Sequence, residues 1–510
     1  MTARPSFSYK TKPYEHQDIV FKRTRDEIAW GLFLDMGCGK SKIFIDTAAW
    51  QYSQGLINGV FLLAPKGVYG NWSDPEQGQF VTHLGDEIQA RAKIFKWRSN
   101  HQTKKFQTEF NEFLQTPEDD LAIFVMNGEA LTSKAAVAAA VAFLKSRKVI
   151  MGVDEATFIK TPTAQVTQKV IKLGRGSITR RVLTGTPVTN SPLDVYSLYE
   201  FLGPDILGFS SFFAFRARYA ILQKQQIGQR SILMVRGYQR HDELRERMQR
   251  ACVIMKKEDC LDLPSKVYET RDVELSPAQA KLYETMRLRS IAELENSEVV
   301  TAPLALTKLL RLHQITLGFI TTEDEFGIKT EHEIDPNGGP RARELLNLVH
   351  ELGDDEKVII WANYTHNIRT ITKLLKSLYE PNGSREMVVG VYDGSTDQEA
   401  RESIVRQFQD PKDPLRFFIG HTRTGGFGLT LTRSANTIYY SNNFSLETRL
   451  QSEDRNHRIG QSRSVTYVDL RSKGTIDDKI VRVLQGKKDL ADQLTNNGWR
   501  RFLDAGYDDF

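Results

Sequence analysis

The chain has 510 residues, of which 40% are hydrophobic and 26% charged, and this is the range of a globular protein with two to four domains. No run of about eighteen apolar residues occurs and the N-terminus lacks the apolar segment of a secretory signal, so we expect neither a membrane span nor secretion. The three cysteines, at 38, 252 and 260, exclude a disulfide framework and show no zinc-ligand spacing, which favours a reducing cytoplasm.

Positive charge is concentrated in one segment. The net charge is +5, and residues 216–250 hold nine Lys or Arg against three Asp or Glu, a local excess of +6. The rest of the chain therefore sums to about −1. Such a stretch is typical of a phosphate-facing surface, although a solvated helix face gives the same pattern.

Short apolar runs recur in both halves of the chain and predict strands. In the first half they are 31–34, 59–64, 121–126, 149–153 and 181–183. In the second half they are 358–362, 387–392, 416–420, 437–441 and 465–470. Continuous apolar runs that alternate with helical segments favour parallel sheets covered on both faces, so two sets predict two α/β lobes.

The middle of the chain has a different pattern. From about 205 to 340, charged helix formers dominate and apolar residues recur at helical spacing. The stretch 321–341 combines turn formers with many charges, and it predicts a loop or a flexible boundary.

A glycine-rich turn follows the first predicted strand, in the run LFLDMGCGKS (32–41). Gly37 and Gly39 allow backbone N–H groups to approach phosphate oxygens, and the following helix N-terminus favours an anion. Lys40 is placed to reach the β- and γ-phosphates and Ser41 to ligate Mg²⁺. The strict pattern has glycine where this chain has Leu34, so the run alone is also consistent with an incidental turn.

Two adjacent carboxylates, Asp154 and Glu155, follow the predicted strand at 149–153. A carboxylate at the carboxyl end of a strand is placed to hold Mg²⁺, and the next one is placed to polarise the attacking water. A solvated loop is the alternative interpretation of this pair.

Taken together, ordered motifs over nearly the whole chain resemble the Swi/Snf-type ATPases, a branch of the superfamily-two helicases and translocases. The segments that carry the resemblance are KPYEHQ (12–17), LDMGCGKSK (34–42), LLAPKGVYGNW (62–72), VDEATFIK (153–160), LTGTPVTNSPLDVYSL (183–198), KKEDCLDLPSKVYETRDVELSPAQAKLY (256–283), KVIIWANYTHNI (357–368), YDGSTDQEAR (392–401), HTRTGGFGLTLTRSANTIYY (421–440) and QSEDRNHRIGQSRSV (451–465). Two positions depart from the family pattern: Thr157 stands where the DEAH box has histidine, and Leu34 replaces a small residue.

The resemblance implies an α/β fold of two RecA-like P-loop lobes, with parallel sheets, helices on both faces and a helical insertion between the lobes. We expect an N-terminal ATP-binding lobe at 1–205, a helical insertion and linker at 206–340, and a C-terminal helicase lobe at 341–510. Compact bacterial or phage members are the most similar in architecture, which implies a cytoplasmic location, nucleoid-associated or in a host cell.

The resemblance also implies that ATP and Mg²⁺ are bound between the lobes. Lys40, Asp154 and Glu155 are expected to be catalytic, with Ser41 and Asp154 holding Mg²⁺ and Glu155 activating water. Arg455 and Arg458 resemble arginine fingers, and their spacing of three places them on one face of a helix; a basic surface cluster is the alternative. The expected ATP-binding residues are Gln17, which resembles the adenine reader, Asp35, Met36, Gly37, Cys38, Gly39, Lys40, Ser41 and Gln451.

The implied function is an ATP-dependent translocase that binds double-stranded or branched DNA, mainly through phosphates, so binding is expected to be sequence-independent and salt-sensitive. The residues expected near the DNA path and its coupling to ATP are Lys66, Thr184, Gly185, Thr186, Thr422, Arg423 and Thr424. Two alternatives stay open: a strand-separating DNA or RNA helicase, and a catalytically weak DNA-binding scaffold. Thr157, which departs from the DEAH box, is the feature that favours the second alternative. The sequence specifies no membrane contact and no protein partner.

Overall fold

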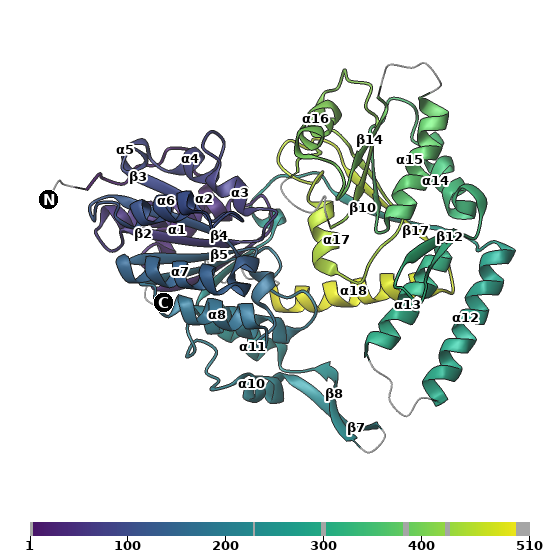
Figure 1. The fold of residues 1–510 in the computed structure, drawn as a ribbon, viewed down its shortest axis with the longest axis horizontal. Helices are drawn as coiled ribbons and strands as arrows, with labels where there is room; N and C mark the ends of the chain where they lie inside the picture. Colours follow the sequence, from purple (N-terminus) through teal and green to yellow (C-terminus); the bar gives the residue numbers. More distant parts are fainter. Residues whose placement is uncertain (1–3, 228–229, 297–301, 381–386, 424–428, 496–510) are drawn as a thin grey trace. The chain divides into compact units, whose positions relative to one another are not determined.

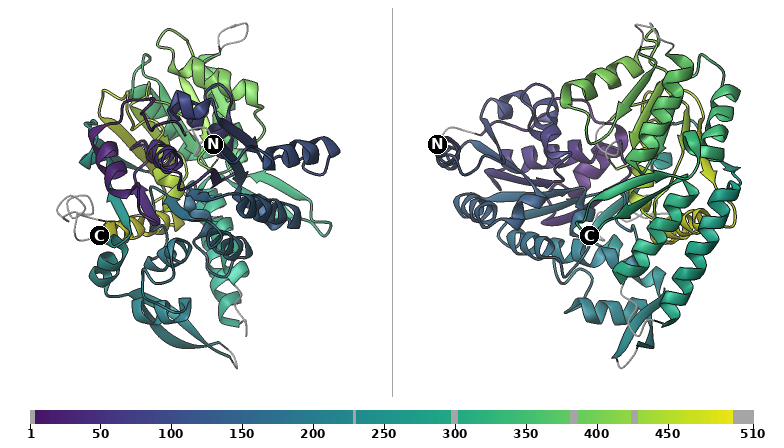
Figure 2. Two further views of the ribbon diagram at one scale, coloured as in Figure 1. Left: turned by 90° about the vertical axis from the view of Figure 1, so that its left-hand side faces the viewer. Right: turned by 45° about the vertical axis from the view of Figure 1, so that its right-hand side comes forward.

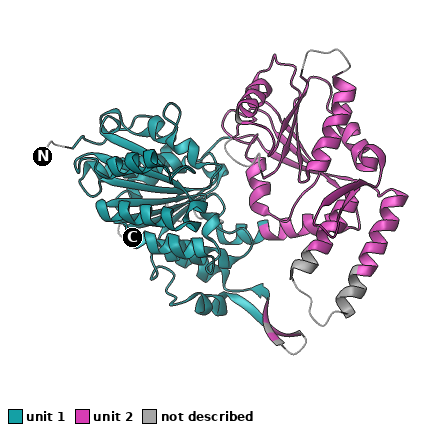
Figure 3. Cartoon of the chain, viewed as in Figure 1, with its two compact units in different colours: residues 1–223, 235–262, 488–510 teal, residues 224–234, 263–487 magenta. Residues whose placement is uncertain are grey.

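The computed structural model describes residues 4–227, 230–296, 302–380, 387–423 and 429–495. The chain divides into two compact units (Figure 3). Unit 1 contains Met1–Gln223, Val235–Asp262 and Lys488–Phe510, and unit 2 contains Lys224–Met234 and Leu263–Lys487. Within the described ranges, no helix combines the length and the apolar character needed to cross a membrane.

Unit 1 is built on a seven-stranded sheet in which every neighbouring pair is parallel, in the order β3-β4-β2-β5-β6-β1-β9 (Figure 1). All five strands predicted in the first half are confirmed. The strands are β1 (Ala29–Leu34), β2 (Gly59–Ala64), β3 (Ala92–Lys96), β4 (Leu121–Asn127), β5 (Val149–Asp154), β6 (Thr179–Leu183) and β9 (Cys252–Met255).

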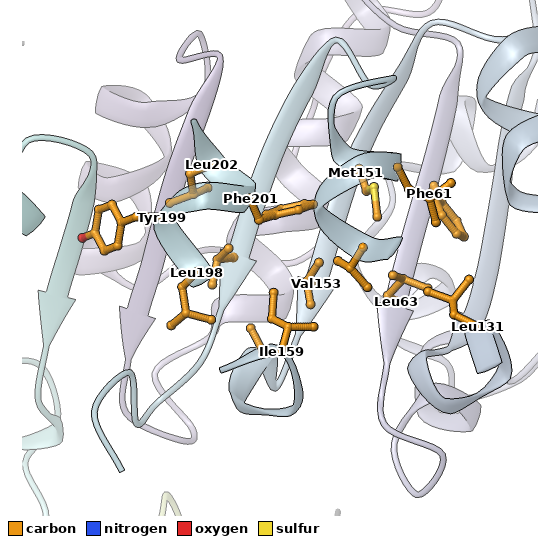
Figure 4. Packing of buried hydrophobic residues seen from close by; sticks show 14 of the residues in the cluster. Phe61, Leu63, Leu131, Met151, Val153, Ile159, Leu198, Tyr199, Phe201 and Leu202 are labelled. Atoms are coloured by element: carbon orange, nitrogen blue, oxygen red, sulfur yellow. The ribbon is translucent and has the colours of Figure 1, made fainter. Parts of the chain in front are cut away.

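Helices cover both faces of this sheet, which explains its continuous apolar strands. All six residues of β2 are buried: Phe61 and Leu63 pack in one core, shown in Figure 4, and Val60 and Leu62 pack in the other. The first core is completed by α6 (Lys104–Leu114), α7 (Lys134–Ser146), α8 (Gln165–Gly174), α9 (Val195–Leu202), α10 (Phe212–Tyr219) and α11 (His241–Gln249). The second is completed by α1 (Glu15–Thr24), α2 (Lys40–Ser53), α3 (Tyr69–Ser73), α4 (Gln79–His83) and α5 (Asp86–Gln89).

Unit 2 has a six-stranded sheet, also parallel, in the order β10-β17-β16-β13-β15-β14. The five strands predicted in the second half are confirmed. Its strands are β10 (Lys266–Asp272), β13 (Val358–Ala362), β14 (Val389–Tyr392), β15 (Phe417–His421), β16 (Asn436–Tyr439) and β17 (Val465–Arg471). Figure 2 gives two further views of the sheets with their flanking helices; in unit 2, α14 (Gly339–Glu351) and α15 (Thr365–Tyr379) pack in one core and α16 (Gln398–Gln409) in the other. Helix α17 (Leu446–Glu453) contacts β16 through a hydrogen bond between the Ser452 and Tyr439 hydroxyls.

The segment between the two predicted lobes is helical, as expected, but it also contributes strands. Its long helices are α12 (Pro277–Asn296) and α13 (Ala302–Thr316), and the chain ends its described part in α18 (Ile476–Thr495). The additional strands are β9, β10 and two hairpins, β7 (Ala220–Ile227) with β8 (Arg230–Tyr238) and β11 (Phe319–Glu323) with β12 (Lys329–Glu333). The loop predicted over 321–341 was therefore wrong at 321–323 and 329–333, which pair antiparallel as β11 and β12, and at 339–341, where α14 begins.

Strand β10 carries part of a buried charge cluster in unit 2. Lys266 Nζ lies 3.1 Å from Glu453 Oε2, and the Tyr268 hydroxyl donates to the same oxygen at 2.8 Å. Arg449 Nε donates to Glu453 Oε1 at 2.8 Å. Burial by itself raises the pKa of Glu453, but the charges of Lys266 and Arg449 outweigh it and lower the pKa to about 2. The carboxylate therefore stays ionised and joins α17 to the edge strand.

We expect Glu453→Gln to destabilise the protein by about 1–3 kcal/mol, because it removes the negative charge that Lys266 and Arg449 share, whereas Arg449 keeps its ion pair with Asp469. Thermal unfolding and hydrogen exchange at 266–272 and 446–453 measure this effect. Glu399→Gln on the exposed surface of α16 is the matched control and should change little. A variant at Glu453 that unfolds with the wild type would contradict the assigned role of the cluster.

Candidate functional site

Three motif loops of unit 1 follow strands that are direct neighbours. Strand β6 lies between β5 and β1, with Leu183 opposite Asp154 on one side and Leu32 on the other. Because all three strands are parallel, their carboxyl ends meet at one edge of the sheet, where α/β folds bind ligands. The phosphate loop, the acidic pair and the TGTP run are thereby brought together from positions about 150 residues apart.

The phosphate loop has the backbone that its glycines allow. Gly37 and Gly39 have φ values of 85° and 88°, in the left-handed region that penalises a side chain, and α2 begins directly afterwards at Lys40. Lys40 is 8% exposed, and its Nζ donates to Leu34 O at 2.8 Å and to Asp35 O at 3.3 Å. The lysine thus lies over the loop. The loop forms with Leu34 at its start, so the departure from the strict pattern does not prevent the turn.

The N-terminal KPYEHQ segment packs against the same loop. Gln17 Nε2 lies 3.4 Å from Cys38 O, and a Cβ on Gly39 would come within 2.2 Å of that nitrogen. His16 Nε2 contacts the same carbonyl at 3.0 Å, and burial lowers the pKa of His16, so the ring is neutral near pH 7. The side chain of Gln17 also accepts from Tyr14 N at 3.1 Å. The structure therefore holds Gln17 beside the loop, while its adenine-reading role stays a prediction.

The acidic pair lies at the end of β5. Asp154 is 5% exposed; its Oδ2 accepts from the Trp72 indole at 2.8 Å and its Oδ1 from Glu155 N at 3.0 Å. Burial raises the pKa of Asp154, although Trp72 and the positive charge of Lys40 oppose that effect. Glu155 adopts a left-handed backbone with φ 44° and ψ 53°, which costs about 1–2 kcal/mol for a residue with a side chain. A strained carboxylate beside a desolvated one is typical of a catalytic site.

The TGTP loop lies directly against the phosphate loop. A Cβ on Gly185 would lie 3.2 Å from Leu34 O and 3.3 Å from Met36 N, so any larger residue would crowd the backbone of the phosphate loop. Thr184 is fully buried and its Oγ1 accepts from Thr186 N at 3.1 Å. The TGTP run is therefore in close backbone contact with the phosphate loop.

A polar network connects Lys160, which follows the acidic pair in its motif, with the run that follows TGTP, and sequence reasoning missed the centre of this network. Lys160 Nζ donates to Thr189 Oγ1 at 2.9 Å, and Thr189 Oγ1 donates to Asp194 Oδ2 at 2.9 Å. Asp194 also accepts from Asn190 N at 2.7 Å, and Ser191 and Asp194 form a capping box. The Ser-x-x-acid spacing of a capping box was the available signal. Thr157 is buried, and its Oγ1 donates to Glu155 O at 3.4 Å.

Asp35 faces away from the TGTP loop. Its carboxylate Oδ2 accepts from Lys257 N at 3.0 Å, and its amide donates to Met255 O at 2.9 Å. The phosphate loop is consequently attached to the end of β9. Lys66 follows β2 at the same edge of the sheet, and its side chain is exposed.

In unit 2, the predicted DNA-path residues follow β15. Thr422 is 3% exposed and its hydroxyl donates to Asn363, which follows the neighbouring strand β13. Arg423 is exposed, and its amide donates to His421 Nδ1 at 3.1 Å. Thr424 lies outside the described residues. Since Thr184 and Thr422 are buried, any effect of either on DNA binding must be indirect.

The two predicted finger arginines lie close together, but not on a helix. Helix α17 ends at Glu453, so the expectation that Arg455 and Arg458 share a helical face was wrong. Both guanidinium groups nevertheless reach one carbonyl, Leu429 O, at 3.3 Å and 3.0 Å. Burial lowers the pKa of Arg458. Gln451 is buried on α17, with its amide 3.4 Å from Glu447 Oε1 and its own carbonyl accepting from Arg455 Nε at 2.8 Å.

These features agree with the family comparison. The SNF2-related domain matches residues 20–316, and the helicase conserved C-terminal domain matches residues 341–460. The chain belongs to the SNF2-related family. The fold of two RecA-like lobes is thereby confirmed.

Similar proteins include an uncharacterized ATP-dependent helicase of Mycoplasma genitalium, 24% identical over 94% of this chain and 42% of the relative. The mouse chromodomain-helicase-DNA-binding protein 1-like is 26% identical over 91% of this chain and 47% of the relative. This SNF2-related chain thus spans less than half the length of these curated relatives. A solved Sulfolobus solfataricus SWI2/SNF2 ATPase core in complex with dsDNA is 21% identical, with 99% of this chain and 97% of that chain covered and a TM-score of 0.41.

Proposed function

We propose that this SNF2-related chain is an ATP-driven motor that moves along double-stranded DNA. The observation that carries the proposal is the convergence of Lys40, Asp154 and the TGTP run at the ends of three adjacent strands. A lysine-bearing loop supports phosphate binding, and a buried carboxylate supports water activation at its neighbour. The TGTP loop, in backbone contact with the phosphate loop, supports coupling.

In this proposal the loop amides and Lys40 bind the triphosphate, and Gln17 reads the adenine. Lys40 must leave Leu34 O and Asp35 O and turn toward the phosphates, which replaces two neutral acceptors by charged ones. Glu155 orients the attacking water and accepts its proton. Arg455 and Arg458 stabilise the negative charge on the transferring phosphoryl group, and Gln451 supports Arg455.

The residues at the strand ends also fit Mg²⁺. The Asp154 carboxylate is desolvated and its pKa is raised by burial, so a nearby cation compensates its charge. Ser41, in the first turn of α2, supplies a hydroxyl ligand, and Asp154 acts through water. When bound, Mg²⁺ neutralises charge on the β- and γ-phosphate oxygens.

Double-stranded DNA is the proposed track, and branched DNA is a second substrate of the same chemistry. Lys66 and Arg423 are the exposed members of the predicted path and supply phosphate contacts. The other described members of the predicted path couple these DNA contacts to the ATP site, because they lie beside the phosphate loop or the neighbouring strand end. They are Thr184, Gly185, Thr186 and Thr422.

The β7–β8 hairpin is a further candidate for a phosphate-facing surface. Residues 206–241 contain six Lys or Arg and no Asp or Glu. Within this stretch Arg218 forms an ion pair with Glu243 at 2.6 Å, but Lys224 is exposed and Arg236 Nε donates to a neutral partner, Gln223 Oε1. The hairpin thus presents positive charge on a surface that local carboxylates do not neutralise.

We expect the double variant Lys224→Ala with Arg236→Ala to weaken DNA binding equally for all sequences. The slope of log affinity against log salt should fall by about one to two, since each lost phosphate contact removes roughly 0.9. Fluorescence anisotropy with a labelled duplex at several salt concentrations measures this slope. Lys104→Ala with Lys105→Ala on exposed α6 is the matched control. An unchanged slope, in a chain whose wild type binds DNA, would remove the hairpin from the interface.

The motor proposal is tested by phosphate release with double-stranded, single-stranded and branched DNA and with RNA, alongside triplex-displacement and strand-displacement assays. We expect the greatest stimulation by double-stranded DNA, and triplex displacement without strand separation. Strand separation would instead indicate a helicase. A chain that binds DNA without DNA-stimulated phosphate release would be a scaffold, and the motor proposal would fail.

A further inference from the structure

Two thiols meet at the phosphate loop. Cys38 Sγ and Cys260 Sγ are 3.4 Å apart although their residues are separated by 222 positions, and both are free cysteines of unit 1. Cys38 is fully buried between Gly37 and Gly39, whereas Cys260 is partly exposed. A disulfide requires about 2.05 Å between the sulfurs, so the two atoms need to approach by roughly 1.3 Å.

The segment that carries Cys260 runs along the loop and is attached to it at several points. Met255 pairs with Leu34 at the end of β9, and Lys257 N donates to Asp35 Oδ2. A single 3₁₀ turn, Lys257–Asp259, then leads to Cys260. The chain leaves unit 1 only two residues later, at Asp262. This arrangement holds the two thiols beside each other through backbone contacts, independently of the sulfurs themselves.

We propose that Cys38 and Cys260 form a reversible disulfide when a hydroperoxide reaches the protein, and that this bond blocks nucleotide binding. The inference rests on the proposed function, since it assigns the loop to ATP. The accessible Cys260 thiolate attacks the peroxide oxygen, which gives a sulfenic acid and releases the alcohol or water. Cys38 sulfur then attacks Cys260 Sγ and its proton leaves with the hydroxyl as water, so two thiols and one peroxide give one disulfide.

The proposed disulfide constrains the phosphate loop at Cys38, which lies in the middle of the loop. Gly37 and Gly39 flank Cys38 with left-handed backbone, so this part of the loop has the conformational freedom that a rearrangement needs. Nucleotide binding requires the loop amides to face phosphate and Lys40 to leave Leu34 O and Asp35 O. A disulfide between Cys38 and Cys260 holds the phosphate loop in the conformation in which Lys40 donates to the loop carbonyls Leu34 O and Asp35 O.

The test uses the full chain and a fluorescent ATP analogue, without DNA, before and after hydrogen peroxide and again after a thiol reductant. We expect oxidation to weaken analogue binding by at least about tenfold, with recovery on reduction. Mass spectrometry of the unreduced digest should show a peptide that joins residues 38 and 260. Cys260→Ser should bind the analogue normally and resist peroxide. Cys252→Ser, which removes the buried cysteine of β9, should respond like the wild type.

Three results would overturn the inference: equal loss of binding in Cys260→Ser, peroxide inactivation without the 38–260 peptide, or formation of that peptide with unchanged binding. Failure of the motor proposal gives a different result. A reduced chain that does not bind the analogue contradicts the ATP assignment, and a chain that binds it but shows no DNA-stimulated turnover contradicts the motor. The cross-linked peptide is measured in either case.

Discussion

Lys40→Ala should reduce ATP turnover by at least about 10²–10³-fold, to a rate below detection. This is the loss expected when one preorganised donor that stabilises developing negative charge is removed. The hydrogen bonds of the Lys40 ammonium go to Leu34 O and Asp35 O, both carbonyls of the loop itself. The core under β1 and α2 is formed by other residues, among them Phe44 and Ile45. The fold should therefore survive the substitution, and phosphate release with saturating double-stranded DNA, together with circular dichroism, measures both effects.

Lys22→Ala provides the matched control for this prediction. Lys22 is an exposed lysine of unit 1 whose Nζ pairs with Asp18 within α1, so its loss should leave turnover near that of the wild type. Substantial DNA-stimulated turnover in a correctly folded Lys40→Ala protein would refute the assignment of the phosphate loop.

Arg458→Ala should lower turnover at least about a hundredfold, consistent with the 10³–10⁵ attributed to arginine fingers. The group is buried enough to lower its pKa, and its guanidinium bonds Leu429 O, so it is held in place before any ligand arrives. Arg455 reaches the same carbonyl and should keep that oxygen satisfied in the variant. Steady-state turnover and analogue binding together separate a loss in kcat from a loss in affinity.

Arg463→Ala tests whether the effect is specific. Arg463 is an arginine of the same motif, 48% exposed, and it forms an ion pair with Glu356 at 2.6 Å. Its removal should change turnover little. Near-normal rates in Arg458→Ala would exclude it from the finger role, and an equal loss in Arg463→Ala would indicate a general disturbance of the motif.

All ten apolar runs form strands, because most of their residues are buried and a continuous apolar run can be recognised without knowledge of the partner strand. The glycine-rich phosphate loop and the carboxylates after β5 were likewise predictable from a few consecutive residues. Strand β10 was not predictable in this way: four of its seven residues are charged, most of them are exposed, and its partner β17 lies about 200 positions further along the chain. The same applies to β9, four residues that become a strand only by pairing with β1.

Within the candidate site, sequence motifs predicted which residue types occur but not how they are held. The Lys160–Thr189–Asp194 network, the bond from Trp72 to Asp154 and the cysteine pair each join residues that are distant in sequence. For Arg455 and Arg458 the local pattern was misleading: their spacing of three suggested a shared helical face, but α17 ends at Glu453, before either arginine. In both cases tertiary packing determines the contact, and no local periodicity encodes it.

The two edge strands β9 and β10 determine how the halves of this protein can be separated experimentally. A fragment that stops before Cys252 leaves the Gly31–Leu34 backbone without its neighbour, next to the loop proposed to bind ATP. A fragment that starts after Asp272 likewise uncovers β17 along all seven of its paired residues. Bare strand edges of this kind recruit other chains. Truncations that divide the protein between Asp262 and Leu263 keep each sheet complete, although they separate unit 1 from the end of α18, whose Leu494 packs in the unit 1 core. Aggregation of shorter pieces would therefore reflect the cut rather than an intrinsic instability of either half.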